Sequence, residues 1–245
     1  FRRALLYATD RENILKDELL GGSDLRDGRL ISGPFPLGSG DTDPLAYAYN
    51  QEVSPVAYNA QLAKLLVTIV RQEMEREAHQ SGSQPPVLEK LVIGCPDFEF
   101  AKIAVQALMQ QWAVIGLDAE MRVLDYIANP ELVSQCDLIY VTTTLWEPAA
   151  DIQRLLGGGG VTASDNPFVV QSLVRVREAK NWREVRNALQ ELHRVVSFHL
   201  PVLPLWQVND RFIVRRGIEG IQDRPVSLYQ NISKWRLPGS SPSGN

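Results

Sequence analysis

The sequence is poor in the features that define several large classes of protein. Its 245 residues include two cysteines and three histidines, and its net charge is −4. Two cysteines are too few for a disulfide framework, and nucleic-acid-binding domains more often carry a basic excess. No apolar run approaches the ~20 residues that a transmembrane helix needs. With 44% hydrophobic and 22% charged residues, the composition is that of a globular chain with one large domain or two small ones.

The start of the chain also lacks an initiating methionine and a recognisable signal peptide. The sequence begins at Phe1 and enters helical periodicity at once. We therefore expect a piece, or a mature domain, of a longer protein. The missing signal then gives no information about the cellular compartment.

The few residues that often carry chemistry are not arranged in a catalytic or metal-binding pattern. His193 and His199 are six residues apart on one predicted helix, which places them on different faces at 100° per residue. We expect these two histidines, and His79, to have surface or capping roles. Cys95 and Cys136 have no CxxC partner, so a zinc site is disfavoured. No metal, no cofactor and no catalytic residue is predicted.

The clearest structural unit is a strand, a helix and a second strand. Residues 88–94 form the first strand candidate, and residues 119–124 alternate between apolar and polar as the second. Between them, apolar residues recur at helical spacing from Phe100 onward, and we expect Asp97 to cap this helix. A third strand is predicted over residues 137–143. We expect strand 88–94 in the middle of a sheet, flanked in parallel by the other two.

This strand order makes a prediction about the two cysteines. Cys95 follows the carboxyl end of one strand, and Cys136 precedes the start of its parallel neighbour. At a rise of ~3.3 Å per residue, the strand length separates them by more than the ~7 Å Cα distance that a disulfide permits. Both thiols are therefore expected to be free.

Further helices and strands are predicted on both sides of this unit. Asn166-Pro167 and Asn181 with Glu184 are typical helix starts. The predicted helices cover residues 4–8, 11–20, 58–78, 149–156, 167–180 and 181–200, and the predicted short strands cover residues 30–31, 203–206 and 211–214.

The segment Trp146-Glu147-Pro148 is the best candidate for a functional site. It follows a predicted strand and precedes a predicted helix, and ligands of open α/β sheets bind outside the carboxyl ends of the strands. An aromatic ring and a carboxylate at that position suit an organic cation or a peptide amine. The structural alternative is a partly buried tryptophan beside a glutamate that favours the helix dipole.

Short motifs along the chain occur in a distinctive order. They are RALLYATDR at residues 3–11, GPFP at 33–36, YNAQLAKLL at 58–66, LVI at 91–93, the helix and strand up to residue 125, DL at 137–138, WEP at 146–148 and PVLPL at 201–205. In this order and spacing they resemble the second half of the family 5 extracellular solute-binding proteins, which are the peptide, dipeptide and nickel binders of ABC importers.

The resemblance implies a fold, a division of the chain and a function. The fold is α/β, the C-terminal lobe of a type II periplasmic-binding-protein-like fold, with a mixed sheet around a parallel strand–helix–strand core. Residues 1–205 form this lobe, residues 206–237 return to the missing first lobe, and residues 238–245 are a mobile tail. The implied function is binding of a small-molecule or peptide solute in the periplasm or another extracytoplasmic space, with ABC permease subunits as partners and a lipid anchor as one option.

A binding lobe of this kind places its ligand at the end of the third strand. The ligand-contacting residues expected there are Thr143, Thr144, Trp146, Glu147 and Asp151. Peptide binders of the family commonly carry an aspartate about three residues before the acidic residue and proline, where it pairs with the peptide's amino terminus. That position is Thr144 here. Peptides with a free amino terminus are therefore expected to bind poorly, unless Glu147 has taken over the role.

Two other classes of function stay open at this point. One is the ligand-sensing domain of a cytoplasmic transcription regulator with the same fold, and the other is an enzyme. The regulator would carry a helix-turn-helix upstream. The enzyme would need a convergent acid–base or nucleophile set, and none is recognisable in this sequence.

Overall fold

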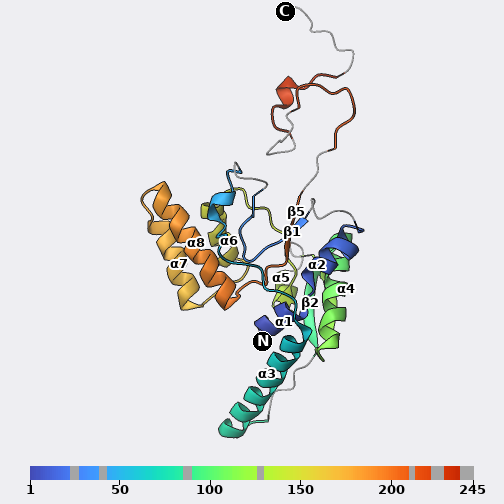
Figure 1. The fold of residues 1–245 in the computed structure, drawn as a ribbon, viewed down its shortest axis with the longest axis vertical. Coiled ribbons are helices and arrows are strands. Elements are labelled where there is room, and N and C mark those ends of the chain that lie inside the picture. The colour runs from blue at the N-terminus through green and yellow to red at the C-terminus, as the bar shows by residue number, and fades with distance from the viewer. Residues whose placement is uncertain are drawn as a thin grey trace, which may run out of the picture. The chain divides into compact units, whose positions relative to one another are not determined.

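The computed structural model describes residues 1–22, 28–38, 43–84, 90–125, 130–209, 213–221 and 229–237. The chain divides into two units, Phe1–Val208 and Asn209–Asn245. In the first unit the α-helices are α1 (Arg2–Ala8), α2 (Arg11–Asn13), α3 (Ala60–Ser81), α4 (Glu99–Val114), α5 (Pro130–Val133), α6 (Pro148–Leu156), α7 (Pro167–Glu178) and α8 (Trp182–His199) (Figure 1). The strands of this unit are β1 (Gly28–Leu30), β2 (Leu91–Pro96), β3 (Ala119–Leu124), β4 (Leu138–Ile139) and β5 (Trp206–Val208).

The central sheet has the predicted order and direction. Strand β2 lies between β3 and β4 and is parallel to both, so the prediction of a parallel three-stranded core is confirmed. The predicted third strand over residues 137–143 was too long. Its pairing ends at Tyr140, whose N–H donates to the Gly94 carbonyl at 2.8 Å. Beyond that point β2 reaches Pro96, which has no N–H to continue the ladder.

Helix α4 is the crossover between β2 and β3 and covers one face of the sheet. Its buried residues are Ala101, Ala104, Val105, Ala107, Leu108 and Trp112. The expected cap at Asp97 was wrong, because the N-cap is Phe98 and no side chain caps the helix. Asp97 lies one residue too early and instead pairs with the ammonium group of Lys102 at 2.5 Å. Gly116 follows the helix at φ +79°, a left-handed conformation that glycine adopts without a steric cost.

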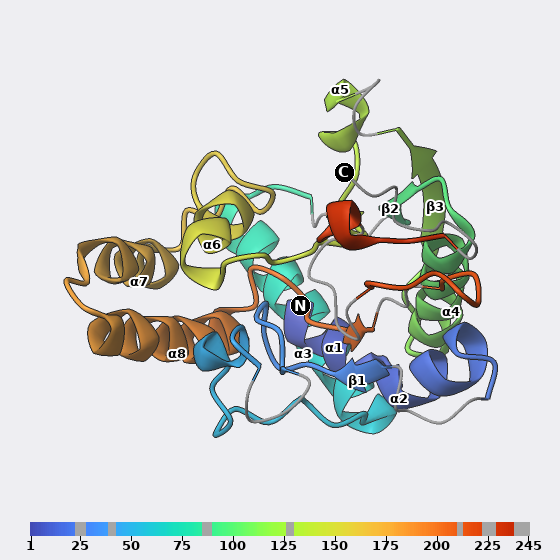
Figure 2. The ribbon, with the colours of Figure 1, turned by 90° about the horizontal axis from the view of Figure 1, so that it is seen from above.

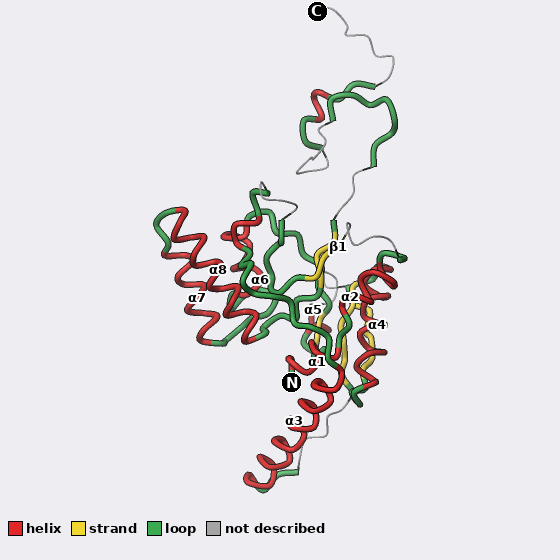
Figure 3. Tube along the Cα trace, viewed as in Figure 1, coloured by secondary structure: helices red, strands yellow, loops and turns green. Residues whose placement is uncertain are grey.

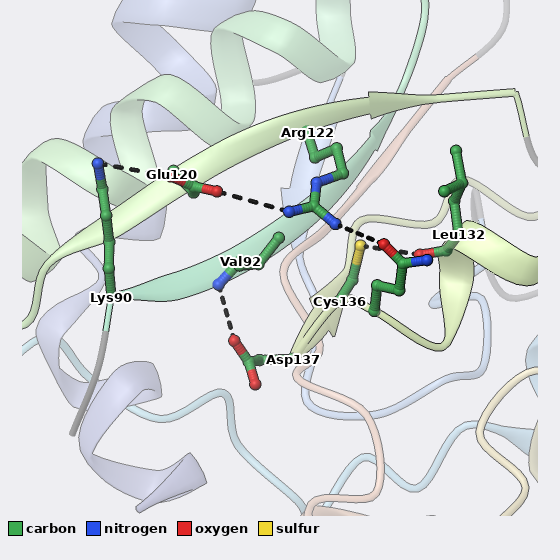
Figure 4. A network of polar contacts seen from close by, with 8 residues as sticks. Lys90, Val92, Glu120, Arg122, Leu132, Cys136 and Asp137 are labelled. Atoms are coloured by element: carbon green, nitrogen blue, oxygen red, sulfur yellow. Dashed lines mark hydrogen bonds and ion pairs between the residues drawn. The ribbon is translucent and has the colours of Figure 1, made fainter. Parts of the chain in front are cut away.

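Charged side chains lie along strand β3 (Figure 4). Glu120 pairs with Lys90 at 3.6 Å and with Arg122 at 3.7 Å. Arg122 also donates to the side-chain oxygen of Gln135 at 3.3 Å. These pairs are partly exposed, so each contributes little to stability, but charges on an edge strand discourage pairing with another chain.

The two cysteines are free, as predicted. Cys95 is fully buried on β2, whereas Cys136 precedes β4 and its sulfur hydrogen-bonds to the Leu132 carbonyl. A side chain at Gly94 would meet the Cys136 sulfur at 3.2 Å. The glycine therefore allows the chain after α5 to pack closely on the middle strand.

Helices α6, α7 and α8 form a second group, in which α7 and α8 lie side by side (Figure 2). Each begins at a side-chain cap, provided by Glu147, Asn166 and Asn181 respectively. At the start of α8, Asn181 accepts the Glu184 N–H at 3.1 Å and Glu184 accepts the Lys180 N–H at 2.8 Å. The predicted starts at Asn166-Pro167 and at Asn181 are thus confirmed.

Two predicted helices differ in detail from the observed ones. The helix predicted over residues 11–20 begins as α2 and continues as a π-helix at Ile14–Leu19. The helix predicted over residues 58–78 is α3, which starts at its cap Asn59 and runs three residues further, to Ser81. The C-terminal half of α3 projects from the rest of the first unit (Figure 1) and is mostly exposed.

The short strands lie next to their predicted positions. Strand β1 pairs antiparallel with β5, with Leu30 opposite Trp206. The strand predicted over residues 203–206 was wrong for its first three residues, because Pro204 has no N–H and its carbonyl is bonded by a side chain. Of the strand predicted at residues 211–214, Ile213 and Val214 are not in a strand. The rest of that strand, the start of the strand at 88–94 and the tail at 238–245 lie outside the described residues.

One arginine is buried at the centre of the first unit. The side chain of Arg11 is 2% exposed. Its guanidinium donates to the carbonyls of Ile31 at 3.0 Å, Val56 at 2.5 Å and Pro204 at 2.6 Å. Burial lowers its pKa to about 10. These carbonyls lie outside helices and strands, so Arg11 supplies backbone partners that regular secondary structure does not.

His193 is also buried, and the expected surface or capping role was wrong for this residue. It is 0% exposed, and its Nδ1 accepts the Asn50 N–H at 2.9 Å. This bond fixes the tautomer, so Nε2 carries the proton and donates to the Ser32 hydroxyl at 3.0 Å. The Tyr49 hydroxyl lies 2.7 Å from the same Ser32 oxygen. The apolar periodicity of the helix does not predict whether His193 is buried. Its burial is favourable only because these loop residues are its hydrogen-bond partners.

The segment that reaches His193 is almost entirely loop. Its described residues between 31 and 59 contain one short 3-10 helix, Ala46–Ala48 (Figure 3). Gly33 lies so close to the imidazole that a side chain there would overlap with its ring. The absence of a side chain at this position therefore lets the loop pack against α8.

The second unit has little regular structure in its described residues, 209, 213–221 and 229–237. Glu219 and Arg236 form an antiparallel bridge, and a 3-10 helix spans Ile232–Lys234. In the described parts of both units, every helix is too short or too polar to cross a membrane.

Candidate functional site

The predicted site lies where the chain leaves the sheet and enters α6. Strand β4 ends at Ile139, residues 141–147 form an extended loop, and Pro148 is the first residue of α6. Pro148 is buried, and its fixed φ suits the first helical position. The segment therefore starts at the carboxyl end of a strand and is fixed at a helix start.

Asp151 holds the backbone of this segment. One of its carboxylate oxygens accepts the N–H of Trp146 at 2.8 Å and the N–H of Glu147 at 3.0 Å. The other oxygen lies 3.3 Å from Arg154, and the Asp151 side chain is only 13% exposed. The hydrogen bonds from the Glu147 and Trp146 backbone, together with Arg154, lower its pKa. Asp151 thus fixes the turn and keeps its charge.

Glu147 has two partners within the chain. Its Oε1 caps α6 by accepting the Ala149 N–H at 3.3 Å. The same oxygen accepts a hydrogen bond from the hydroxyl of Tyr47, which lies 100 residues earlier in the chain. Burial, and then the bond to Glu147, raise the pKa of the Tyr47 phenol. The phenol therefore remains a protonated donor to this carboxylate.

Two exposed tryptophans belong to the surroundings of Glu147 in the chain and in space. Trp146, its neighbour in sequence, is 57% exposed. Trp182, at the start of α8, is 60% exposed and packs against the Tyr47 ring with 4.4 Å between centroids. The partly buried tryptophan of the structural alternative is therefore not what is found at Trp146. Glu147 does lie at the helix start, as that alternative required.

Thr143 and Thr144 are both exposed and precede the turn held by Asp151. The five predicted residues thus lie in one segment of the described structure. Glu147 joins this segment to Tyr47, and the Tyr47 ring packs against Trp182. The sequence contains no signal for these two partners. Tyr47 lies in an irregular segment, and Trp182 is simply the first residue of a capped helix.

The described residues contain no metal-binding cluster, and a Ser–His pair among them is buried. No group of three histidine, cysteine or acidic side chains there could hold a metal ion. Ser32 and His193 are hydrogen-bonded, as a nucleophile and its base would be. They are 2% and 0% exposed, so a substrate cannot reach the serine oxygen in this conformation.

A cavity of about 510 Å³ lies elsewhere in the first unit, between Arg2, the loop at residues 162–167 and the end of α8 at His199. Its walls carry opposite charges, on Arg2 and Asp165. None of the five predicted site residues lines it. The predicted segment is an exposed surface instead of an enclosed pocket.

Solved structures with the same fold include three ligand-bound proteins. The oligopeptide-binding protein AppA from Bacillus subtilis, in complex with a nonapeptide, matches 96% of this chain at a TM-score of 0.75 and 17% identity, and 47% of its own length is covered. NikZ from Campylobacter jejuni, in complex with Ni(L-His), matches 96% of this chain at 0.68 and 16%, with 48% of its length covered. A periplasmic oligopeptide-binding protein from Thermotoga maritima, bound to mannohexaose, matches 84% at 0.61 and 17%, with 40% covered.

These matches confirm the expected fold, an α/β lobe of a periplasmic binding protein. The chain spans about half the length of the solved proteins that it matches. No family model and no curated protein sequence matches it.

Proposed function

We propose that this chain is the C-terminal, ligand-binding lobe of an extracytoplasmic solute-binding protein that serves an ABC importer. The observation that carries the proposal is the fold match over 96% of the chain to proteins about twice as long. In the proposal, a second lobe completes the cleft. Closure on the solute shifts a hinge equilibrium, and the closed form docks on the permease subunits.

The proposed contact segment is Thr143–Asp151. Its position at the carboxyl end of β4 is the place where α/β sheets bind ligands. The rings of Trp146 and Trp182 support this assignment, because both are more than half exposed and therefore accessible to a ligand. The protein would carry out no covalent chemistry.

The proposal extends to the division of the chain. Residues 1–205 would form the lobe, and the chain would return to the first lobe further along. Because β5 still pairs with β1 in the first unit, the return would begin after Val208. A sensor domain of a cytoplasmic transcription regulator is not favoured, since one of the matching solved structures reported above is the periplasmic binding protein of an ABC transporter.

Native mass spectrometry of the full-length protein, purified without denaturation, tests the proposal. We expect a bound solute in the wild-type protein and its loss in Trp146→Ala. The matched control is Phe168→Ala, since Phe168 is 61% exposed on α7 and lies outside the segment. Retention of the solute in Trp146→Ala at the wild-type level would show that the site lies elsewhere.

A further inference from the structure

The loop that carries Tyr47 is attached to one face of α8. The Asn50 N–H donates to Nδ1 of His193 at 2.9 Å, and the Asn50 side chain donates to the Gln190 carbonyl at 3.2 Å. The Gln190 side chain in turn donates to the Tyr47 carbonyl at 3.3 Å. Because Gln190 and His193 are three residues apart on the helix, they are neighbours on one face. Both ends of residues 47–50 are therefore fixed by the same part of α8.

The same short stretch of loop also reaches the contact segment. Residues 46–48 form a 3-10 helix that ends with a backbone hydrogen bond of 3.2 Å, so Tyr47 and Asn50 are held in one turn. The Tyr47 hydroxyl donates to Oε1 of Glu147. A continuous series of hydrogen bonds and one turn of backbone therefore leads from His193 through Asn50 and Tyr47 to Glu147.

The bond between His193 and Asn50 requires a neutral imidazole. Nδ1 accepts the Asn50 N–H, whereas both nitrogens of a protonated imidazole are donors. Protonation would thus leave two donors facing each other at a ring that is 0% exposed, where water cannot separate them. Burial lowers the pKa of His193 to about 4, so the neutral form prevails near pH 7 and the bond can form.

The described surroundings of the His193 ring hold no carboxylate that could stabilise its charged form. The loop packs the rings of Phe35 and Tyr49 on it, with centroids 5.8 and 4.6 Å away, and of these only the Tyr49 phenol can titrate. Arg11 interacts electrostatically with Tyr49 and would oppose a further positive charge. On α8 itself the residues one turn away are uncharged. The buried side chains of α6 and α7 are apolar, apart from the hydroxyl of Ser172.

We propose that His193 is a positioning residue for the contact segment. It holds, through Asn50, the loop that brings Tyr47 to Glu147, and protonation of its ring releases that loop. The consequence for binding rests on the function proposed above: without Tyr47, Glu147 and the Trp182 ring lose the partner that fixes them, and binding must include the cost of ordering them. The solute is then held less tightly in an acidic space than in a neutral one.

Hydrogen exchange of the Asn50 amide in the full-length protein, without added solute, tests the proposal, because this N–H exchanges when its bond to His193 opens. With a pKa of about 4 in the bound loop and 6.5 in the released one, the ratio of released to bound loop rises about eight-fold between pH 7 and 5.5. We expect the protection factor of Asn50 to fall by that amount in the wild-type protein. It should stay constant in His193→Gln, which keeps an acceptor and a donor but does not titrate. The matched control is His199→Gln, on the same helix, which should behave like the wild type.

A second variant tests the link to the contact segment without changing His193. Tyr47→Phe keeps the ring but removes its bond to Glu147, so the loop should open more easily if it is coupled to the segment. We expect the Asn50 protection factor at pH 7 to fall by about three- to ten-fold, the usual net contribution of one hydrogen bond. Tyr58→Phe, at an exposed tyrosine before α3, is the matched control and should leave the protection factor unchanged.

The outcomes separate this proposal from the one on which it rests. A wild-type protection factor that does not change with pH, or an equal change in His193→Gln, overturns the role of His193. Protection of Asn50 that is unaffected in Tyr47→Phe overturns the link to the contact segment. Low concentrations of urea distinguish release of the loop from global unfolding, and equal urea sensitivity at Asn50 and at Tyr140, whose N–H is bonded in the sheet, would also overturn the proposal. Because no solute is involved, these results stand even if native mass spectrometry finds none and the proposed function fails.

Discussion

The first unit contains two hydrophobic cores that are built in different ways. The sheet core lies between α1, α3, α4 and the central strands, and its buried side chains include Leu5, Val67, Ile93 and Leu108. The helical core joins α6, α7 and α8 to a long loop that contributes Phe35 and Tyr49. Regular elements supply most of the first core, whereas the second depends on loop residues that must be held against a helix.

The difference extends to their polar groups. In the sheet core the Trp112 indole donates to the Thr9 hydroxyl at 3.1 Å, and Thr9 donates to the Leu5 carbonyl one turn earlier. In the helical core His193 is bonded to Ser32 and Asn50, which lie more than 140 residues away in the chain. Burial of a polar ring is tolerated only when it is hydrogen-bonded. The helical core thus depends on distant loops adopting one particular conformation.

The largest expected effect comes from the residue that connects the two cores. Arg11 bonds the carbonyl of Ile31, which packs against the helical core, and that of Pro204, between two residues that pack against the sheet core. Arg11→Met removes the partner of three carbonyls, one in a buried hydrogen bond and two in partly buried ones, and we expect a loss of about 3–5 kcal/mol in unfolding free energy. Urea unfolding measures it. Arg194→Met, which removes an exposed arginine paired with Glu191, should cost less than about 1 kcal/mol; equal losses would contradict the role of Arg11.

Acidification should destabilise the protein through the helical core. Burial lowers the pKa of His193 from 6.5 to about 4. Between these values the unfolded chain binds a proton that the folded chain does not, so stability is complete above pH 6.5 and falls as the pH drops towards 4. The expected loss is about 3 kcal/mol. Urea unfolding from pH 7 to 4.5 measures the slope, which should be shallower in His193→Gln; an identical slope in the variant would contradict the prediction.

Adding one methyl group should destabilise the protein at Gly33, in the loop packed against His193, but not at Gly158, where the surroundings are open. Gly33→Ala places a Cβ against the His193 ring, and overpacking of this kind costs about 1–3 kcal/mol. Gly158→Ala is the control, because nothing lies within 4 Å of a Cβ at that position. Thermal unfolding compares the two, and an equal shift in midpoint would mean that the loop moves away from His193 without cost.

The smallest expected change in unfolding free energy comes from substitutions at two helix starts, one near each core. Asn181 caps α8, whereas Asp97 does not cap α4. Asn181→Ala should cost about 1 kcal/mol, and Asp97→Ala, which removes only a surface ion pair, should cost about 0.5 kcal/mol or less. Urea unfolding of both variants checks the order. A larger loss of unfolding free energy in Asp97→Ala than in Asn181→Ala would indicate that Asp97 does cap α4.

Periodicity was sufficient to predict the sheet core. The apolar spacing from Phe100 identified α4, and the alternating residues 119–124 identified β3, so the parallel order of the sheet could be predicted. The end of β4 was missed because it depends on Pro96 in another strand. Asp97 was misassigned because the helix starts one residue later than its composition suggested.

The candidate site and the buried polar residues were less predictable. Trp146, Glu147 and Pro148 could be recognised as a strand-to-helix segment, but the link from Glu147 to Tyr47 spans 100 residues. The burial of His193 likewise depends on Ser32, Gly33 and Asn50, whose loop has no period of its own. Contacts of this kind are set by tertiary packing, and a local pattern in the chain carries no information about them.

The hydrogen bonds of Arg11 also set an order of events during synthesis. Its three partners lie 20, 45 and 193 residues further along the chain. At roughly 5–20 residues per second, the ribosome adds Pro204 roughly 10–40 s after Arg11. During that interval the growing chain lacks the last acceptor, and the guanidinium has no complete set of protein partners to replace its water. The centre of the first unit therefore closes only when its last segment has left the ribosome, however early its helices form.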